Sequence, residues 1–433
     1  MKKIAFRTLG CRLNQYETDA LASRFHKGSY QIVDFNDSAD IYVVNTCTVT
    51  NQSDQKSRQT INQAHRKNKD ALVVVTGCMA NNYKDSLLHA DHINYLVDNE
   101  RKSSIFSLVE SHFRGDVADP EGFDKDLFSY EAAYETFHTR SMIKIQDGCD
   151  NFCTFCIIPK VRGRASSRPL KEIITNIQAV LDYGFKEVVL TGVNIGRYHD
   201  GQTNFEQLVE RIINLPGDFR VRISSIEPDG FSDRFFELFA HPKLTPHLHL
   251  CLQSGSESVL LRMRRMYTAK QFRGMAEKLR LMYPDFNLTT DIIVGFPGET
   301  DSDFEQTVSL AKDITFSHIH TFKYSIRTGT RAERMDGQIT EKLKNQRSAV
   351  IRSISETGKR NYISKMIGKN QRLLTERIGH DGIVKGYGEH YFPLRVNSKV
   401  LSKNQFVDVR ITDLYEATEP AAIADIIPHS SEI

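Results

Sequence analysis

The stretch that decides the fold is Ile145–Cys156, IQDGCDNFCTFC, which holds three of the seven cysteines of the chain. Cys149, Cys153 and Cys156 follow the spacing C-x3-C-x2-C, and no fourth Cys or His lies nearby. A structural zinc site normally takes four protein ligands, usually built from paired C-x2-C elements. A 4Fe-4S cluster that is held by three thiolates leaves one iron open to a non-protein ligand. The spacing therefore favours a reactive iron–sulfur site over a closed zinc site.

The segment around this stretch alternates apolar runs with amphipathic helical patterns such as residues 170–184 and 301–313. Six β/α units of this kind predict a partial (β/α)6 barrel, in which the chemistry lies at the carboxyl ends of the strands. The first predicted strand ends where the three cysteines begin. The six predicted strands are residues 141–146, 187–192, 220–225, 247–253, 288–295 and 318–325.

The amino-terminal region predicts a parallel α/β sandwich, with strands at residues 2–10, 40–46 and 71–77 and helices between them. Each of these strands runs directly into a cysteine. Because the carboxyl ends of parallel strands share one edge of a sheet, we expect the three thiols to converge. The alternative is three buried apolar cysteines, a common environment for a free thiol. The cysteines are Cys11, Cys47 and Cys78.

The remaining chain divides by composition. Residues 114–140 combine acidic residues with Pro and Gly and predict a linker, and a long helical pattern covers roughly residues 340–366. Short alternating runs at the carboxyl end predict a small antiparallel β-barrel. We expect four parts: residues 1–113, the linker 114–140, the barrel with its following helix 141–366, and the small barrel 367–433.

Composition limits the class of protein. A chain of 433 residues with 40% hydrophobic content has enough material for two to four domains. No leader-like segment and no apolar run of roughly 18 residues occurs, so we expect a cytoplasmic protein without membrane contact. The net charge is only +3, but residues 342–410 carry 15 Lys or Arg against 5 Asp or Glu, a local net charge of +10. That segment is predicted to meet a polyanion, unless it is only a solvated helix face with scattered lysines.

An open iron at the loop cysteines suits S-adenosylmethionine, which can chelate it through its amino and carboxylate groups and yield a 5′-deoxyadenosyl radical on reduction. C-x3-C-x2-C at the end of the first strand of a β/α barrel resembles the radical S-adenosylmethionine superfamily. The loops after the later strands offer backbone and polar groups for this ligand. The predicted cofactor-binding residues are Gly192, Asn194, Glu227, Gln253, Ser254 and Gly295.

A closer resemblance covers the chain from near its start to beyond residue 320. The segments LGCRLNQYETD, VNTCTVT, VTGCMA, QDGCDNFCTFCIIP, LTGVNIGRY, SSIEP, LQSGSESVLLRMRRMYT and DIIVGFPGET together resemble the radical S-adenosylmethionine methylthiotransferases. The first and fifth segments are most similar to the MtaB-type branch. The resemblance implies transfer of a methylthio group to C2 of N6-threonylcarbamoyladenosine at position 37 of tRNA.

The resemblance also implies cofactors and partners. Two 4Fe-4S clusters are expected, an auxiliary one held by Cys11, Cys47 and Cys78 and a catalytic one held by Cys149, Cys153 and Cys156 that binds S-adenosylmethionine. The small carboxyl-terminal barrel resembles a TRAM domain, an RNA-binding module of the family. The expected partners are the tRNA anticodon stem-loop and an external flavodoxin-like or ferredoxin-like electron donor, and we expect a monomer.

Other residues are weaker candidates. Tyr387, Tyr391 and Phe392 are candidates to stack on bases, since such stacking contributes roughly 1 to 3 kcal/mol per base, and the alternative is that the tyrosines belong to the core. Cys251 lies in an apolar run and is predicted to be a core residue. The family commonly has Pro at that position, and a Pro-rich segment where this chain has Tyr324–Thr330, YSIRTGT. The arginines predicted to hold phosphates are Arg262, Arg264, Arg265, Arg327 and Arg331.

Two alternatives remain open. The substrate is either threonylcarbamoyladenosine, isopentenyladenosine in tRNA or, as in a third branch of the family, an aspartate of a ribosomal protein. A non-enzymatic iron–sulfur protein that binds RNA or senses redox state would retain the same cysteine loops but would not cleave S-adenosylmethionine.

Overall fold

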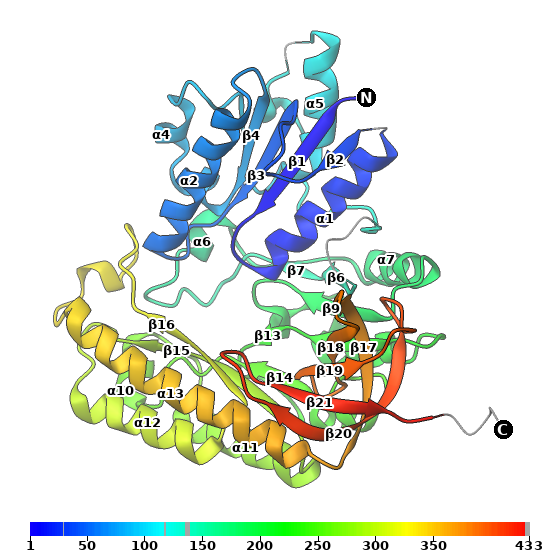
Figure 1. The fold of residues 1–433 in the computed structure, drawn as a ribbon. Helices are drawn as coiled ribbons and strands as arrows, with labels where there is room; N and C mark the ends of the chain where they lie inside the picture. Colours follow the sequence, from blue (N-terminus) through cyan, green and yellow to red (C-terminus); the bar gives the residue numbers. More distant parts are fainter. Residues whose placement is uncertain (29, 117, 135–138, 429–433) are drawn as a thin grey trace.

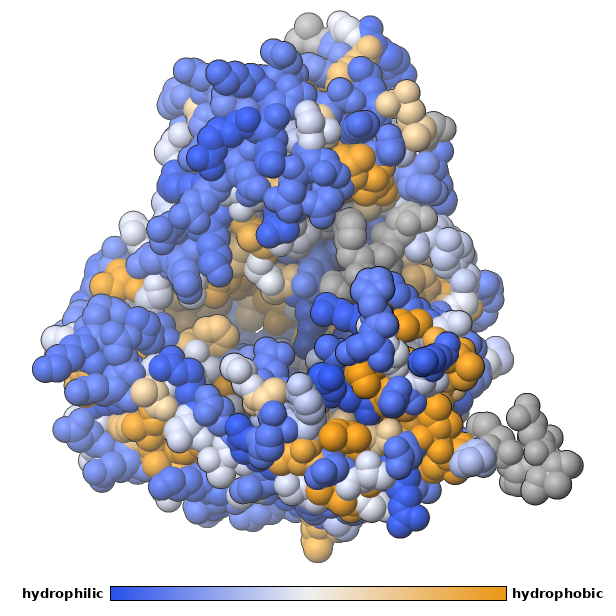
Figure 2. Space-filling view, viewed as in Figure 1, coloured by the Kyte–Doolittle hydropathy of each residue, from blue (hydrophilic) through white to orange (hydrophobic). Residues whose placement is uncertain are grey.

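The computed structural model describes residues 1–28, 30–116, 118–134 and 139–428. Figure 1 shows a parallel sheet with its helices at the top, a large curved sheet with helices below it, and a small barrel in orange and red against the lower sheet. Figure 2 shows the surface hollowed between the upper sheet region and the lower barrel. Among the described residues, no helix combines the length and apolar character needed to cross a membrane.

The amino-terminal region is a five-stranded parallel sheet in the order β2-β1-β3-β4-β5. Both central strands, β3 and β4, are buried along their whole length, which explains their continuous apolar sequence. Helices α1 and α5 pack on one face with Phe25 and Leu108, and α2 packs on the other with Ile61. The strands are β1 Lys3–Thr8, β2 Gln31–Val33, β3 Ile41–Thr46, β4 Leu72–Gly77 and β5 Tyr95–Val97, and the helices are α1 Arg12–Lys27, α2 Asn51–Lys67, α3 Cys78–Asn82, α4 Lys84–Leu88, η1 Lys102–Ser104 and α5 Ile105–Arg114.

The three predicted strands correspond to β1, β3 and β4, whereas β2 and β5 were missed. Each missed strand has three residues, which is too short to show a period.

The central region is a single curved parallel sheet, because one bent strand joins its two halves. Arg220–Ile223 pairs with β9, and the chain then bends at Ser224 so that Ser225–Ile226 pairs with β14. Within the described residues β6 and β16 are not paired, so the barrel is open along one side. Each of the six predicted strands is present. They are β6 Ser141–Lys144, β9 Glu187–Thr191, β12 Arg220–Ile223 with β13 Ser225–Ile226, β14 His247–Leu250, β15 Asn287–Val294 and β16 His318–Lys323.

Helices cover the outside of this sheet and α13 follows it, as predicted for residues 340–366. They are α7 Leu170–Asp182, α8 Phe205–Ile213, α9 Asp233–Glu237, α10 Glu257–Arg262, α11 Ala269–Met282, α12 Asp301–Ile314 and α13 Glu341–Met366, whereas α6 Ile158–Val161 lies against α3 of the upper region. Short elements complete the region: β7 Gln146–Asp147, β8 Ser166–Ser167, β10 His199–Asp200, β11 Thr203–Asn204, η3 Ile195–Arg197, η4 Leu238–Ala240 and η5 Ala332–Arg334.

The inside of the central barrel is polar. Along each strand, apolar side chains such as Val221 and Leu248 belong to the core under the helices. Because side chains alternate along a strand, their neighbours point to the opposite face, into the lumen. Those neighbours include the buried Lys144, Arg222 and His247. A charged lumen is costly to build without paired groups, which points to a role for it in the site.

The carboxyl-terminal barrel is closed, in the order β17-β18-β19-β21-β20. The prediction of a purely antiparallel barrel is wrong for one pair, since β19 and β21 are parallel. The strand β21 was also missed, because its sequence AAIADI is short and rich in small residues. The strands are β17 Asn370–Ile378, β18 Ile383–Tyr387, β19 Pro393–Asn397, β20 Phe406–Tyr415 and β21 Ala421–Ile426.

A turn of this small barrel closes the amino-terminal mouth of the central barrel. Asn287 at the start of β15 donates from Nδ2 to the carbonyl of His390 at 2.6 Å. The Tyr391 ring lies under the guanidinium of Arg222, 3.7 Å from its central carbon, and contacts His247. This turn therefore covers the amino-terminal mouth of the lumen.

The predicted linker is packed against the barrel. Tyr130 and Ala133 are buried, and Arg168 donates from Nη2 to the carbonyl of Tyr130 at 3.1 Å. The short helix η2 Pro120–Gly122 lies within this segment, and part of the segment, residues 117 and 135–138, falls outside the described residues. The four predicted domain boundaries stay a prediction.

Candidate functional site

The structure brings the three amino-terminal cysteines together. Cys11 follows β1, Cys47 directly follows β3, and Cys78 begins α3 after β4. Gly10 has φ +94°, and a Cβ there would lie 2.8 Å from Sγ of Cys47, so a glycine is required for this approach. Burial, followed by the neighbouring thiols of Cys78 and Cys11, raises the pKa of Cys47 to about 11. The thiol of Cys47 is therefore protonated at neutral pH unless a metal replaces the proton.

The loop cysteines occupy a tightly held segment between β7 and α6. Gly148 has φ +65°, and a Cβ there would lie 1.9 Å from the carbonyl oxygen of Arg164. The loop is fixed by the amide of Cys149, which donates to Gly163 at 3.2 Å, and by that of Cys156, which donates to Cys153 at 3.0 Å. Burial, followed by Cys153 and Cys149, raises the pKa of Cys156 to about 12. Each set thus consists of three thiols, and burial raises the pKa of Cys47 in one set and of Cys156 in the other.

The two sets face each other. Cys78 packs with Ile157 and Val161, which follow Cys156 in the chain. Asn99 donates from Nδ2 to the carbonyl of Val161 at 2.9 Å and fixes this contact. The end of the upper sheet that carries its cysteines is therefore placed directly against the cysteine loop of the barrel.

A buried ionic network holds the two regions in this position. Arg162 donates to Asp147 at 2.9 Å, and Lys144 contacts Glu17 of α1 at 2.9 Å. Lys102 also pairs with Glu17, and all five side chains are at most 1% exposed. Burial alone would raise the pKa of Glu17, but Arg162, Lys102 and Lys144 hold it well below its ordinary value. The sequence pattern did not signal this network.

A second ion pair crosses the same interface. Arg327, in the loop after β16, donates to Oδ2 of Asp54 at 2.6 Å and to the carbonyl of Thr48 at 2.9 Å. The prediction that Arg327 holds a phosphate is therefore wrong, since its guanidinium is buried in this contact.

Three polar side chains surround the loop cysteines. Asn194 lies with Nδ2 3.9 Å from Sγ of Cys149, and Arg265 lies with Nη1 3.2 Å from Sγ of Cys153. Arg265 also pairs with Glu227 at 3.0 Å. Oδ1 of Asn194 and Nη2 of Arg265 are buried without a hydrogen-bond partner. Such orphaned polar atoms beside three thiols fit a site that a polar, thiolate-bound group completes.

The other predicted cofactor-binding residues divide into two groups. Gln253 lines a cavity of about 210 Å³ together with Cys156 and Asp291. Gly192 lies against Gln146, whose Oε1 accepts from the amide of Asn194 at 2.7 Å, so Gly192 supports the site indirectly.

Ser254 and Gly295 do not offer groups to the cavity. Ser254 is fully buried, with its Oγ 3.2 Å from Oγ1 of Thr307 in α12. Gly295 packs against Lys344, and its amide donates to Glu299 at 2.6 Å. The chain turns after Gln253 and after β15 toward the helices, and the role of both residues in cofactor binding stays a prediction.

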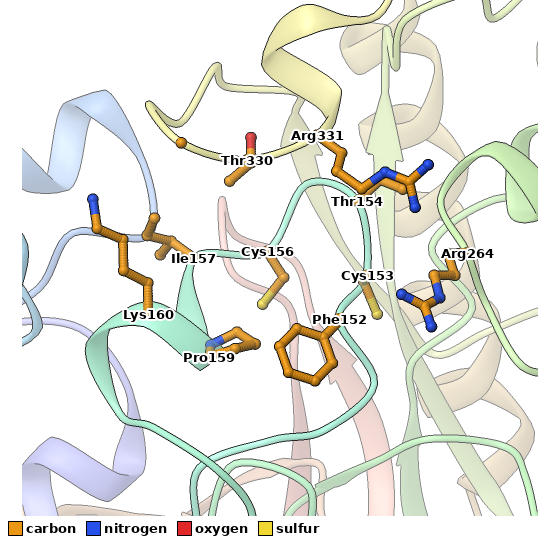
Figure 3. A pocket seen from close by; sticks show the side chains of 11 residues that line it. Phe152, Cys153, Thr154, Cys156, Ile157, Pro159, Lys160, Arg264, Thr330 and Arg331 are labelled. Carbon is orange, nitrogen blue, oxygen red and sulfur yellow. The ribbon is translucent and has the colours of Figure 1, made fainter.

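A second cavity, of about 380 Å³, lies on the outer side of the cysteine loop. Figure 3 shows Cys153 and Cys156 on this loop with the ring of Phe152 beside them, and Arg331 on the loop that follows β16. Arg264 and Arg331 are exposed here and remain available to an anionic ligand. Arg262 instead donates to the carbonyl of Pro297 at 3.0 Å, and the side chain of Arg265 is 4% exposed and pairs with Glu227, so the phosphate prediction is wrong for Arg265.

Cys251 is not a core residue, contrary to the prediction. It is half-buried, and its thiol donates to Oδ2 of Asp291 at 3.7 Å, while Nε2 of His249 lies 3.0 Å from Oδ1 of the same carboxylate. His249 and Cys251 alternate with the core residues Leu248 and Leu250, and Asp291 precedes the core residue Ile292 on β15, so all three side chains point into the lumen. The alternation of His247, His249 and Cys251 with leucines was the sequence signal for this orientation of Cys251.

The aromatic residues of the small barrel are not free to stack on bases. Phe392 is 3% exposed and belongs to the barrel core. Tyr387 and Tyr391 stack on each other and on Arg140, and Arg140 donates to the Tyr391 hydroxyl at 2.9 Å. The structure favours the alternative of core residues over base stacking, since all three rings are used inside the protein.

Comparisons with known proteins agree with this architecture. Residues 3–98 match the family model described as uncharacterized protein family UPF0004, and residues 143–311 match the radical SAM superfamily. A Thermotoga maritima protein, threonylcarbamoyladenosine tRNA methylthiotransferase MtaB, is 36% identical over 99% of this chain and 98% of its own length. The chain belongs to the radical S-adenosylmethionine methylthiotransferase family.

Further relatives are similar over most of this methylthiotransferase chain. The Bacillus subtilis protein of the same name is 38% identical, over 90% of this chain and 89% of its own. A tRNA-2-methylthio-N(6)-dimethylallyladenosine synthase from Syntrophus aciditrophicus is 33% identical over 87% and 84% of the two chains. The fold is similar to that of the radical S-adenosylmethionine methyltransferase TsrM from Kitasatospora setae, with a TM-score of 0.57, 14% identity and 77% coverage of both chains.

Proposed function

We propose that this methylthiotransferase transfers a methylthio group to C2 of N6-threonylcarbamoyladenosine at position 37 of tRNA. The observation that carries the proposal is the arrangement of two three-cysteine sets at facing strand ends, joined through the contact of Cys78 with Ile157. Relatives named for this substrate are 36% and 38% identical over nearly the whole chain. We propose a 4Fe-4S cluster at each set and S-adenosylmethionine at the loop cluster, which supplies methyl groups and the radical when bound.

The chain's own residues have distinct roles in this proposal. The three thiols of each set hold iron and leave one coordination position for another ligand. Arg265 places a positive charge beside Cys153 and is itself fixed by Glu227. The unpartnered Oδ1 of Asn194 is an acceptor for the amino group of S-adenosylmethionine. The networks around Glu17 and Arg327 fix the distance between the two sets and exclude water from their interface.

We propose that the small barrel is the TRAM-like RNA-binding part. Its exposed basic residues, rather than its tyrosines, are the candidates for phosphate contacts, and a stem-loop target places an unpaired base within reach of the hollow. These residues are Arg377, Lys385, Lys399, Lys403 and Arg410.

The test is anaerobic reconstitution followed by three measurements on one sample. We expect about eight irons per chain, formation of 5′-deoxyadenosine after reduction, and a methylthio group on an anticodon stem-loop that carries threonylcarbamoyladenosine. Iron without cleavage of S-adenosylmethionine would favour a non-enzymatic iron–sulfur RNA-binding protein. Cleavage with modification of a dimethylallyladenosine stem-loop alone would assign the chain to the activity for which the Syntrophus relative is named.

A further inference from the structure

The guanidinium of Arg12 lies near the entrance of the central barrel, and no described residue pairs with it. Arg12 is the first residue of α1 and directly follows Cys11, at the end of the upper sheet that faces the barrel (Figure 1). Its side chain is half-buried, and among residues 1–28, 30–116, 118–134 and 139–428 no hydrogen bond or ion pair to it is present. A half-buried guanidinium that is not neutralised by the protein is suited to an anionic ligand.

Arg12 lies beside Cys11, at the edge of the upper sheet that packs on the cysteine loop of the barrel, and its charge also acts on groups inside the barrel. Burial and then Arg12 lower the pKa of Arg222 to about 9. The pKa of His320 is lowered first by burial and then by His249, and Arg12 lowers it further. Arg12 also contributes to lower pKa values at His247 and Tyr391, although burial alone would raise the latter. The groups whose pKa values Arg12 lowers lie on β12, β14, β16 and the turn that carries Tyr391.

Arg222 extends the same positive region deeper into the barrel. It is 1% exposed, and its Nε and Nη1 have no hydrogen-bond partner. The carboxylate of Glu187 is 3.8 Å from Nε, but it also pairs with Arg220 at 2.6 Å. The positive charge of Arg222 is thus only partly compensated, and an anion that enters the lumen above it is stabilised.

His320, on β16, supplies a further hydrogen-bond donor. It lies on β16 and is exposed to the hollow, with Nδ1 3.3 Å from Nε2 of His318. Asp291 lies across from it in the register, but this carboxylate is engaged by His249 at 3.0 Å. Asp291 lines the cavity that contains Cys156. A ligand group that contacts His320 is therefore close to this cavity, and the Asp291 carboxylate beside it is already held by His249.

We propose that Arg12 and His320 bind the carboxylate of the threonyl group of the substrate nucleoside. This inference rests on the proposed function and names the residues that select its substrate. The threonylcarbamoyl substituent carries one carboxylate, whereas a dimethylallyl substituent carries no charge. A guanidinium matches a carboxylate with two parallel hydrogen bonds, and an uncharged substituent leaves Arg12 unpaired in a partly dry site. Charge recognition at the barrel entrance thus separates the two classes of modified adenosine.

The test compares two anticodon stem-loops that differ in one group. One carries threonylcarbamoyladenosine, and in the other the threonyl carboxylate is converted to an amide. Binding is measured by fluorescence anisotropy for the wild-type chain and for Arg12→Gln, Arg12→Lys and His320→Ala. We expect the wild type to prefer the carboxylate by about tenfold or more, Arg12→Gln to lose this preference, and Arg12→Lys to retain part of it. The matched control is Arg7→Gln, since Arg7 is exposed on β1 away from the lumen.

The outcomes separate the inference from the proposed function. A loss of affinity of Arg12→Gln that is equal for both RNAs, or no loss at all, overturns the inference. Iron content, measured on each variant, shows whether a change beside Cys11 acts only through the cluster. If the wild type forms no methylthio product on either RNA, the proposed function fails, while the binding preference still reports on Arg12. In turnover, we expect Arg12→Gln to raise KM for the carboxylate RNA by about tenfold with little change in kcat.

Discussion

Both sites consist of three cysteine thiols, but the chain brings these thiols together in different ways. Cys149, Cys153 and Cys156 lie within eight residues on one loop, so local backbone geometry alone brings them together. Cys11, Cys47 and Cys78 lie far apart in the chain and meet only because β1, β3 and β4 are adjacent and parallel. The loop site is therefore recognisable from spacing, whereas the sheet site depends on the fold. The difference also predicts that the two sites fail differently when they are disturbed.

The largest expected effect follows from removal of a loop ligand. Cys149→Ala leaves two thiols at the catalytic site, so we expect complete loss of 5′-deoxyadenosine formation and of about half of the iron, from roughly eight to roughly four per chain. The measurement is anaerobic product analysis with iron determination. Full cleavage by this variant would contradict the assignment of the loop.

Removal of a cysteine from the sheet site should affect only the transfer of the methylthio group. Cys47→Ala also removes about half of the iron, but we expect it to retain cleavage of S-adenosylmethionine and to form no methylthiolated RNA. Mass spectrometry of the stem-loop together with 5′-deoxyadenosine analysis checks this. Continued product formation would show that the sheet site has no part in sulfur transfer. The pair of cysteine variants thus tests whether the two sites divide the reaction.

The interface between the sites is tested by its ionic network. Glu17→Gln leaves Lys102, Lys144 and Arg162 without their shared carboxylate, so we expect a loss of about 3 to 5 kcal/mol in the free energy of unfolding. The matched control is Glu131→Gln, whose exposed pair with Lys27 should contribute about 1 kcal/mol or less. Both are measured by denaturant unfolding of the apo protein. Equal losses of unfolding free energy in the two variants would show that the buried network does not hold the two sites together.

The same network predicts a direction of pH dependence. The pKa of Glu17 is well below its ordinary value of 4.5 in the folded protein, so this stabilisation is present above about pH 4.5 and is lost as the pH falls. The wild type should therefore lose stability between about pH 5 and pH 3 more steeply than Glu17→Gln. Unfolding curves at several pH values check this, and parallel curves for both proteins would contradict it.

The smallest expected effect concerns the backbone of the sheet site. Gly10→Ala introduces a Cβ 2.8 Å from Sγ of Cys47 at a positive φ, and we expect a loss of about 1 to 3 kcal/mol and of iron at the sheet site. Gly115→Ala is the control, since its φ is also positive but nothing lies within 4 Å of the added Cβ. The control should lose stability but no iron. Loss of iron in both variants would mean that strain alone, and not the contact with Cys47, disturbs the site.

The sequence predicted the parts of the site that depend on spacing and periodicity. The six barrel strands, the long helix after them and the convergence of Cys11, Cys47 and Cys78 follow from apolar runs and from the shared edge of parallel strands. Strands of three residues and the all-small β21 carry no such signal.

Side-chain direction was not predictable in the same way. Ser254 follows Gln253, whose φ of +66° reverses the direction of the chain and turns the serine toward α12. Glu17, Lys144 and Arg162 are charged residues that a sequence pattern assigns to the surface, and only the docking of two regions buries them. Arg265 and Arg327 were misassigned for the same reason, because their partners come from distant segments.

The turn that carries Tyr391 closes one end of the central barrel. Because this turn fills the amino-terminal mouth of the barrel beneath Arg222, a nucleoside that enters from the end facing the upper sheet cannot pass through to the opposite end. A nucleoside bound above Tyr391 then occupies the lumen until it leaves. The residence time of the product thus sets an upper limit on the turnover rate, and the turn of the small barrel contributes to that limit as the base of the pocket.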